Sequence, residues 1–228
     1  PLADAYFEVR AASEALAAPL SAEDCALQSM PDASPVKWHL AHTTWFFETF
    51  VLAPHVRDYA PLDPAYRMLF NSYYNAVGDR YPRPDRGLLS RPSLDDVRAY
   101  RAHVDAAMAR LTVEGMDAAL AGIVTLGLHH EQQHQELILT DVKHLFAHNP
   151  LRPRYTPAWP LASVTPRRAD FVSYAGGLHE FGHEPRDGVF AFDNEGPRHR
   201  AYVAPFALAS RLVTNDEFIR FIDDGGYR

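Results

Sequence analysis

The stretch LHHEQQHQEL, residues Leu128 to Leu137, lies inside a longer run whose apolar residues recur with helical periodicity. His130 and His134 are one helical turn apart, so both imidazoles project from one side of a helix and can reach one metal ion. The same inward stripe holds Gly127, which leaves space for a ligand, and also Leu137 and Asp141. Two core histidines satisfied by hydrogen bonds are the alternative. Two inward histidines with an inward aspartate favour a metal site.

The residues before position 150 carry helical signals. Ser34-Pro35 is a cap residue followed by proline, Pro54 is a stop signal, and Ser93 with Asp96 has the spacing of a capping box. Shorter helical segments are expected for 21–30 and 63–75, with a loop at 78–92. The four long helices are expected at 2–18, 35–53, 93–111 and 117–149, and together they predict a four-helix bundle.

A third histidine can complete the predicted metal site. On the helix expected for 35–53, Trp38, His42 and Trp45 share one face, so His42 lies between two tryptophans. By itself His42 would be an ordinary core residue, but two inward histidines lack a third ligand, and metal sites in bundles form from facing helices. His39 projects about a quarter turn away. We therefore expect His39 to be structural or partly exposed.

Composition excludes several classes of protein. The chain has 228 residues, 47% of them hydrophobic and 22% charged, which is ordinary for a globular protein. The formal charge of −7 argues against nucleic-acid binding, and the most apolar run, 43–53, is too short to span a membrane. Cys25 is the only cysteine, which excludes an internal disulfide and a cysteine metal site. No secretion signal is recognised, so a soluble cytoplasmic protein is expected.

Two further patterns have plain structural interpretations. Asp95, Asp96, Arg98 and Arg101 read as a solvated helix face with favourable charge pairs. From residue 150 the chain becomes rich in proline and then in strand signals, with a hairpin expected around Ala175-Gly176-Gly177, a strand at 200–209, and a helix that begins at Thr214 and ends near Gly225.

Two histidine motifs carry a resemblance to a known family. Trp38-His39-Leu40-Ala41-His42 together with the His130–His134 motif resembles the EgtB-type sulfoxide synthases of ergothioneine biosynthesis. Those enzymes join a DinB-like four-helix bundle to a formylglycine-generating-enzyme-like (C-type-lectin-like) domain, whose opening resembles residues 192–199 and 212–218. In the family this second domain continues well beyond the position of Arg228. The resemblance thus implies a DinB-like metal-binding bundle at 1–149, a proline-rich linker at 150–169, and the N-terminal part of the second domain at 170–228.

The resemblance implies a non-haem iron(II) held by His42, His130 and His134. Three imidazoles on one side of an iron leave positions open for dioxygen and substrates. The implied reaction uses O2 to join the thiol of cysteine or gamma-glutamylcysteine to the imidazole carbon of hercynine (trimethylhistidine), with oxidation of the sulfur to a sulfoxide. Small molecules are thus the implied partners, and neither a nucleic acid nor a membrane is expected.

The resemblance also implies roles for residues around the metal. Gln133 matches a family residue that hydrogen-bonds the hercynine imidazole. Tyr73 and Tyr74 resemble tyrosines that one branch of the family places near the metal as proton donors. Arg83 and Arg86 lie in a segment whose family counterpart binds the carboxylate of the thiol substrate, a task that suits guanidinium groups.

Three other interpretations stay open. His130-Glu131-Gln132-Gln133-His134 is also a literal H-E-x-x-H, in which Glu131 would be the general base of a zinc protease, although the residues that extend that motif are missing. A DinB-like thiol transferase would use the same histidines with zinc or nickel. A non-catalytic bundle with a lectin-like binding module would hold no metal.

Overall fold

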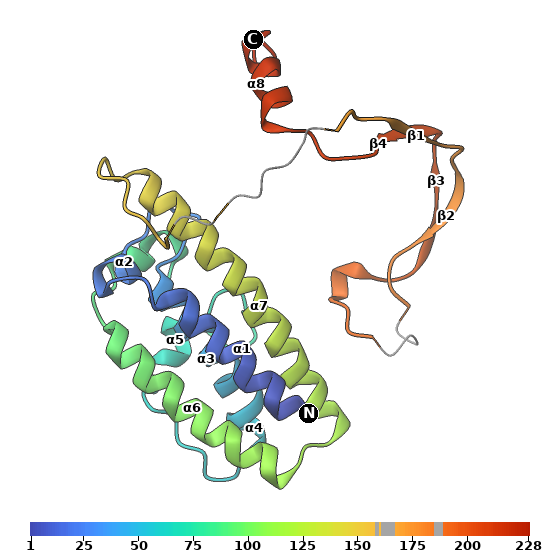
Figure 1. The fold of residues 1–228 in the computed structure, drawn as a ribbon. Helices are drawn as coiled ribbons and strands as arrows, with labels where there is room; N and C mark the ends of the chain where they lie inside the picture. Colours follow the sequence, from blue (N-terminus) through green and yellow to red (C-terminus); the bar gives the residue numbers. More distant parts are fainter. Residues whose placement is uncertain (158–159, 161–166, 185–188) are drawn as a thin grey trace. The chain divides into compact units, whose positions relative to one another are not determined.

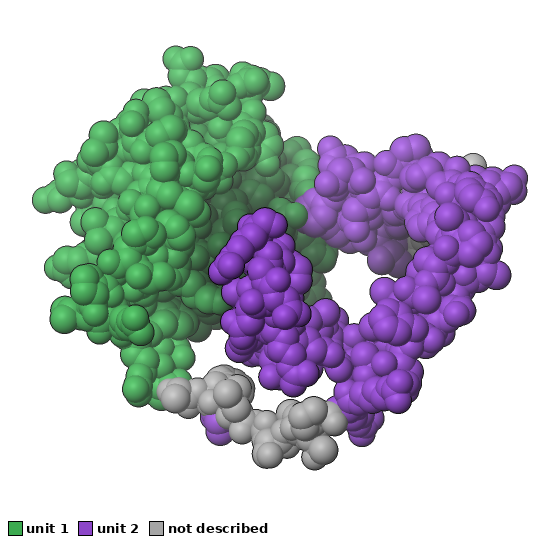
Figure 2. All heavy atoms as spheres, turned by 90° about the horizontal axis from the view of Figure 1, so that it is seen from above, with its two compact units in different colours: residues 1–158 green, residues 159–228 purple. Residues whose placement is uncertain are grey.

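The computed structural model describes residues 1–157, 160, 167–184 and 189–228. The chain divides into two compact units, residues 1–158 and residues 159–228 (Figure 2). Part of the expected linker, at 158–159 and 161–166, lies outside the described residues, so the linker assignment stays a prediction.

Unit 1 is a four-helix bundle, as the sequence predicts. Helix α3 contacts α1, α6 and α7, and α1 also contacts α7 (Figure 1). The four long helices are α1 (Leu2–Ala17), α3 (Val36–Phe47), α6 (Leu94–Glu114) and α7 (Ala118–Ala147). Every residue of α3 is buried, because the other helices surround it. The central position of α3 places His42 in the interior of the bundle.

Helix α3 continues beyond its expected end at Ala53. A π-helical turn, η1 (Glu48–Leu52), leads into a last helical turn, α4 (Ala53–His55), so Pro54 does not stop the helix. Proline has no N–H to donate, and the turn directly before it is wider than an α-helical turn: the backbone N–H of Ala53 bonds to the carbonyl of Glu48, five residues back.

The short segments between the long helices are less helical than the sequence suggests. The expected helix 21–30 is only α2 (Ala22–Ala26), and 63–75 contains only α5 (Tyr66–Leu69). Beyond α5, the amide of Asn71 donates to the carbonyls of Tyr74 and Gly78, which favours turns over helix. The expected loop 78–92 contains a short 3-10 helix, η2 (Arg83–Leu88).

Most expected helix starts are confirmed. Ser21, Ser93 and Thr214 each form a capping box with the acidic residue three positions on, and Asp117 caps α7. Ser34 is the exception, because Pro35 occupies the cap position of α3. Ser34 instead donates its backbone N–H to Asp141 and accepts a hydrogen bond from Arg86.

Unit 2 contains a bent two-stranded ribbon, and the expected hairpin around Ala175-Gly176-Gly177 is wrong. Its strands are β1 (Phe171–Tyr174), β2 (Gly177–Phe181), β3 (His199–Val203) and β4 (Phe206–Ala209), with β1 paired to β4 and β2 paired to β3, both antiparallel. The expected single strand 200–209 is thus divided. The two ladders share one register, because Tyr174 pairs with Phe206 and, three positions on, Gly177 pairs with Val203.

The bend in the ribbon has a local cause. Pro205 cannot donate a ladder hydrogen bond, and Gly176, on the other side of the ribbon between β1 and β2, has a φ of 74°. A Cβ atom on Gly176 would lie 2.5 Å from the carbonyl oxygen of Val203 and 2.7 Å from the nitrogen of Pro205. The two strands therefore approach too closely for any residue except glycine at this point.

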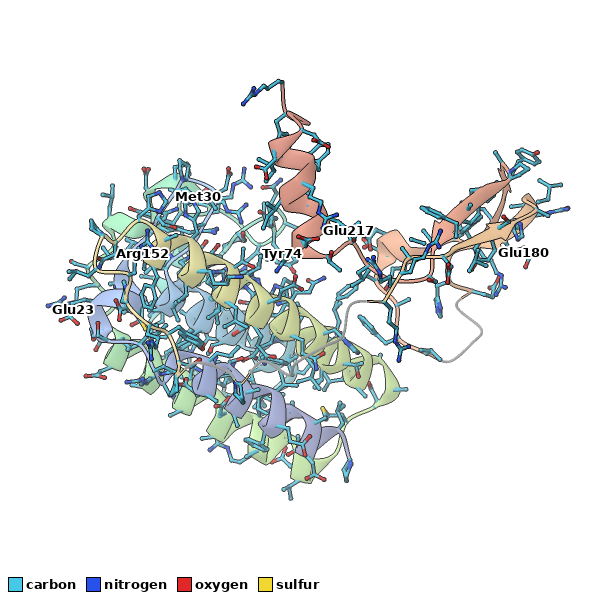
Figure 3. All side chains as sticks on the ribbon, turned by 45° about the horizontal axis from the view of Figure 1, so that its top comes forward. Glu23, Met30, Tyr74, Arg152, Glu180 and Glu217 are labelled. Atoms are coloured by element: carbon cyan, nitrogen blue, oxygen red, sulfur yellow. The ribbon has the colours of Figure 1, made fainter. Side chains whose placement is uncertain are left out.

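Unit 2 ends in α8 (Asn215–Asp223), followed by Gly225 as expected. Glu217 lies in its first turn, and Figure 3 also shows Glu180 on β2. None of the helices in the described ranges combines the length and the apolar character that crossing a membrane requires.

Candidate metal centre

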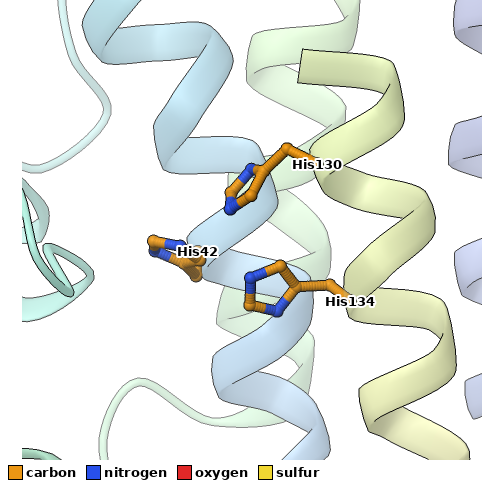
Figure 4. A group of neighbouring side chains, drawn as sticks. All are labelled: His42, His130 and His134. Atoms are coloured by element: carbon orange, nitrogen blue, oxygen red, sulfur yellow. The ribbon is translucent and has the colours of Figure 1, made fainter. Parts of the chain in front are cut away.

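Three histidines from two helices converge inside unit 1. One ring nitrogen from each of His42, His130 and His134 lies within 4.8 Å of the other two (Figure 4). His42 comes from α3 and the other two come from successive turns of α7. Among the described residues this is the only group of three such side chains with metal-ligand spacing. The structure thus brings together the three residues that the sequence selects.

The ring of His42 is held on both faces and at one edge. Trp38 stacks on it at 4.6 Å between ring centroids, and Trp45 stacks on it at 5.5 Å. Its Nδ1 lies 2.6 Å from the carbonyl oxygen of Phe70. A carbonyl oxygen only accepts, so Nδ1 carries the proton and Nε2 keeps a free lone pair, which is the form that binds a metal.

The two histidines of α7 differ in their surroundings. Nδ1 of His134 lies 2.8 Å from Nδ1 of His39. Nδ1 of His130 is buried and has no hydrogen-bond partner among the described residues, and its ring packs against Phe46 at 5.1 Å. A buried, unpartnered imidazole nitrogen is costly in a purely structural histidine. This arrangement fits a ring placed there to bind a metal.

Electrostatics keep the three imidazoles neutral. Burial lowers the pKa of His130 to about 4. Burial, and next the neighbouring histidines, hold the pKa values of His42 and His134 well below the usual range. A neutral imidazole is the form that coordinates a metal, so the donor set needs no deprotonation at neutral pH.

Two expectations about the inner face of α7 need correction. Gly127 does not leave space for a ligand, because a Cβ there would lie 2.6 Å from Phe47 and 2.7 Å from Phe46, whose rings fill the position. Leu137, expected inside, is 37% exposed. Because helix α7 packs on both α1 and α3, its buried face is wider than the single expected stripe and is shifted around the helix.

His39, expected to be structural or partly exposed, is buried. Only 2% of its surface is accessible, and its Nε2 lies 3.0 Å from Asp141 Oδ2. The expected inward position of Asp141 is confirmed, since it is buried and bonds both His39 and the backbone N–H of Ser34.

Glu131, between the two histidines of α7, belongs to a different buried network. Its carboxylate accepts hydrogen bonds from Arg10, Arg101 and Ser13, and no part of its side chain is exposed. Burial opposes its ionisation, but Arg10 and Arg101 outweigh that effect and lower the pKa of Glu131. Arg101 is therefore a core residue, and its assignment to a solvated face is wrong.

A cavity of about 490 Å³ is lined by arginines and by the segment that follows Phe70. Arg83 donates to the hydroxyl of Tyr73, and its Nε is buried without a partner among the described residues. Arg86 is 2% exposed and donates to the hydroxyls of Ser34 and Ser72. Two guanidinium groups beside one cavity can bind an anion.

The tyrosines and Gln133 occupy different surroundings. Tyr73 is 63% exposed and borders the arginine cavity. Tyr74 is half-buried, and its ring centroid lies 5.5 Å from that of Trp45, which stacks on His42, and 5.0 Å from that of Phe50. Gln133 is exposed on α7. The proposed roles of these three residues stay predictions.

Sequence reasoning missed the contact of His39 with His134 and the partners of Glu131. The contact of His39 with His134 could have been expected, because His39 is one helical turn before His42 and therefore borders the same face of its helix. The partners of Glu131 could not, because Arg10 is 121 positions from Glu131 in the sequence.

Comparisons with known proteins agree with the two-unit architecture. Residues 5–149 match the family model described as DinB superfamily, and residues 160–228 match the one described as Sulfatase-modifying factor enzyme 1-like domain. The chain is 32% identical over 208 residues to a hercynine oxygenase of Mycolicibacterium thermoresistibile and 31% identical over 207 residues to that of Mycolicibacterium smegmatis. It is 33% identical over 206 residues to that of Mycobacterium tuberculosis.

These alignments cover 86–88% of this chain but only 43–45% of each relative, so the chain spans less than half the length of these relatives. They cross both units. The chain therefore belongs to the DinB superfamily and, with its sulfatase-modifying-factor-like second domain and its similarity to hercynine oxygenases, is an EgtB-type protein.

Proposed function

We propose that this chain is the metal-binding part of a non-haem iron(II) sulfoxide synthase of ergothioneine biosynthesis. The reaction would use O2 to form a C–S bond between hercynine and the thiol of cysteine or gamma-glutamylcysteine and would oxidise the sulfur to a sulfoxide. The single observation that carries the proposal is the convergence of His42, His130 and His134 on one position. The names of the three relatives support the substrate and the oxygenase class.

The donor set fits iron(II) and would also accept zinc. Three neutral imidazoles on one side of an ion leave open positions for other ligands. Iron supplies the redox chemistry that O2 activation requires, whereas zinc has no accessible redox step. The relatives are oxygenases by name, which favours iron over the zinc or nickel of a thiol transferase.

The arginine cavity is proposed to bind the carboxylate of the thiol substrate through Arg83, whose Nε has no partner among the described residues. Arg86 also has a buried Nε without a partner among the described residues, but both of its terminal nitrogens already donate to Ser34 and Ser72. Gln133 is proposed to bind the hercynine imidazole. A phenol of Tyr73 or Tyr74 is proposed to donate a proton from its hydroxyl during the reaction.

The protease interpretation is disfavoured by Glu131. A general base must reach a water molecule on the metal, but this carboxylate is buried and bonded to two arginines and a serine. The non-catalytic interpretation does not explain why Nδ1 of His130 is buried without a hydrogen-bond partner among the described residues.

The test is the metal content of the 228-residue chain purified anaerobically, followed by oxygen consumption with hercynine and either thiol. Iron near one atom per chain and hercynine-dependent oxygen uptake are expected. Zinc or nickel in place of iron, with no oxygen uptake after iron is supplied, would favour the thiol transferase. Absence of any bound metal would contradict the whole proposal.

A further inference from the structure

A chain of three hydrogen bonds leads from the start of α3 to one of the metal-facing histidines. Asp141 Oδ2 accepts from the backbone N–H of Ser34 at 2.9 Å and lies 3.0 Å from His39 Nε2. The other nitrogen of the same ring, His39 Nδ1, lies 2.8 Å from His134 Nδ1. His39 is 2% exposed, so water does not compete for either contact.

The carboxylate of Asp141 determines which atoms carry the protons along this series of hydrogen bonds. The carboxylate of Asp141 accepts, so His39 Nε2 carries the proton between them. A neutral His39 then has a lone pair at Nδ1, and the proton between the two Nδ1 atoms belongs to His134. The other nitrogen of His134, Nε2, faces the rings of His42 and His130 (Figure 4). The opposite arrangement would make His39 a buried imidazolium and would leave the proton of a neutral His134 on this Nε2.

We propose that His39 and Asp141 are positioning residues that hold His134 in the tautomer whose Nε2 lone pair faces the metal position. The inference rests on the metal site proposed above and deepens it. Both nitrogens of His39 are already hydrogen-bonded, so His39 is not itself a ligand. Its task is to orient the ring of His134 and, backed by a carboxylate, to make that ring a stronger donor.

Helix α3 thus has two functions at the metal position. It provides His42 as a ligand and, one turn earlier, His39 as the support of a ligand from α7. His42 is oriented differently, by the carbonyl of Phe70. Loss of His39 should therefore affect His134 and leave the orientation of His42 unchanged.

The first measurement is the affinity of the metal-free chain for Co(II), followed by its visible absorption and by competition with a chelator. His39→Phe removes both hydrogen bonds while keeping a ring of similar size. We expect it to weaken Co(II) binding by about 10- to 100-fold. His39→Asn places a carbonyl oxygen near the position of Nδ1, where it can accept from His134, so it should recover most of the affinity. Asp141→Ala should fall between the wild type and His39→Phe.

The second measurement is independent of metal. Long-range ¹H–¹⁵N correlation spectra of the metal-free chain report which nitrogen of each histidine carries the proton. His134 should be protonated at Nδ1 in the wild type and should lose this preference in His39→Phe and in Asp141→Ala. If His39→Phe does not fold, Asp141→Ala and the wild-type spectrum decide the question.

The proposal is overturned if wild-type His134 is protonated at Nε2. It is equally overturned if folded variants bind Co(II) as tightly as the wild type and merely melt at lower temperature, because that result marks a structural role only. Failure of the proposed function looks different: a chain that binds no metal or consumes no oxygen, but keeps His134 in the expected tautomer, would overturn the synthase and leave the His39–Asp141 support in place.

Discussion

The guanidinium carbon of Arg86 lies 3.4 Å from the centre of the Trp38 ring, and Trp38 stacks in turn on His42. Arg86 comes from η2, beside the arginine cavity, whereas Trp38 and His42 belong to α3. The cavity and the metal-facing ring are therefore linked by one continuous stack. Only 2% of Arg86 is exposed, and this burial lowers the pKa of its guanidinium to about 9.

Replacement of Arg86 by lysine should disturb this stack. An ammonium group cannot lie flat on the indole and donate to Ser34 and Ser72 at once. We expect Arg86→Lys to lower the free energy of unfolding by about 1–3 kcal/mol, measured by urea denaturation. Arg91→Lys is the matched control, because Arg91 is exposed and, among the described residues, its side chain donates only to the neighbouring Ser90 carbonyl. Equal stability of the two variants would show that the stack is not stabilising.

The metal ligands can be tested one at a time. His42→Ala, His130→Ala and His134→Ala should each abolish stoichiometric iron binding, because two imidazoles from a three-histidine site leave too few donors. His144→Ala is the control on α7, since His144 bonds to Ser29 outside the cluster. Metal analysis after anaerobic purification is the measurement. A His42→Ala variant that still holds one iron per chain would refute the three-histidine assignment.

Acid should destabilise the metal-free chain through His130. Its pKa is near 6.5 when unfolded and about 4 when folded, so between these values the unfolded chain binds more protons. Stability therefore falls as the pH drops from about 6.5 to about 4, by about 1.4 kcal/mol per pH unit for each such histidine. Urea denaturation at several pH values in the presence of a chelator measures this slope. His130→Gln should flatten it, and an unchanged slope in that variant would contradict the assignment.

Glu131→Gln should cost stability without removing the metal. The substitution deletes the charge that Arg10 and Arg101 face in the core, for which we expect a loss of about 3 kcal/mol. Glu136→Gln, on the exposed side of α7, should change little. Thermal unfolding and metal content together test this. Loss of metal with unchanged stability would move Glu131 from the buried network to the metal site.

Substitution of Tyr73 and Tyr74 can distinguish a role in proton donation from a role in packing. If either phenol is the donor, Tyr73→Phe, Tyr74→Phe or the double variant should keep the iron but slow catalysis or divert it toward thiol dioxygenation. Product analysis by mass spectrometry, with metal content as the control, makes the distinction. Unchanged products and rates in the double variant would leave Tyr74 as a packing residue against Trp45 and Phe50.

Much of the bundle follows from local patterns. Capping boxes at Ser93 and Thr214, the cap at Asp117 and the helical periodicity around His130 depend on residues within a few positions, and the structure agrees with each. The inward faces of His42, His130, His134 and Asp141 follow from the same periodicity. These features could be predicted because a helix start or a helix face is set by neighbours in sequence.

Local patterns failed where a distant partner decides the outcome. The glycine pair at 176–177 reads as a hairpin turn, yet the strands on either side of it pair with β3 and β4. Arg101 reads as a surface charge, yet it is buried with Glu131.

The sequence by itself determined which residue types are available and which face of α3 and α7 each one shares. The tertiary structure alone decided that Phe46 and Phe47 fill the space beside Gly127, and that His39 meets His134 across 95 positions of chain. The physical reason is that helical periodicity fixes the direction of a side chain relative to its own helix only. A contact between two helices depends on how they pack against each other, and that packing is specified by both sequence segments together.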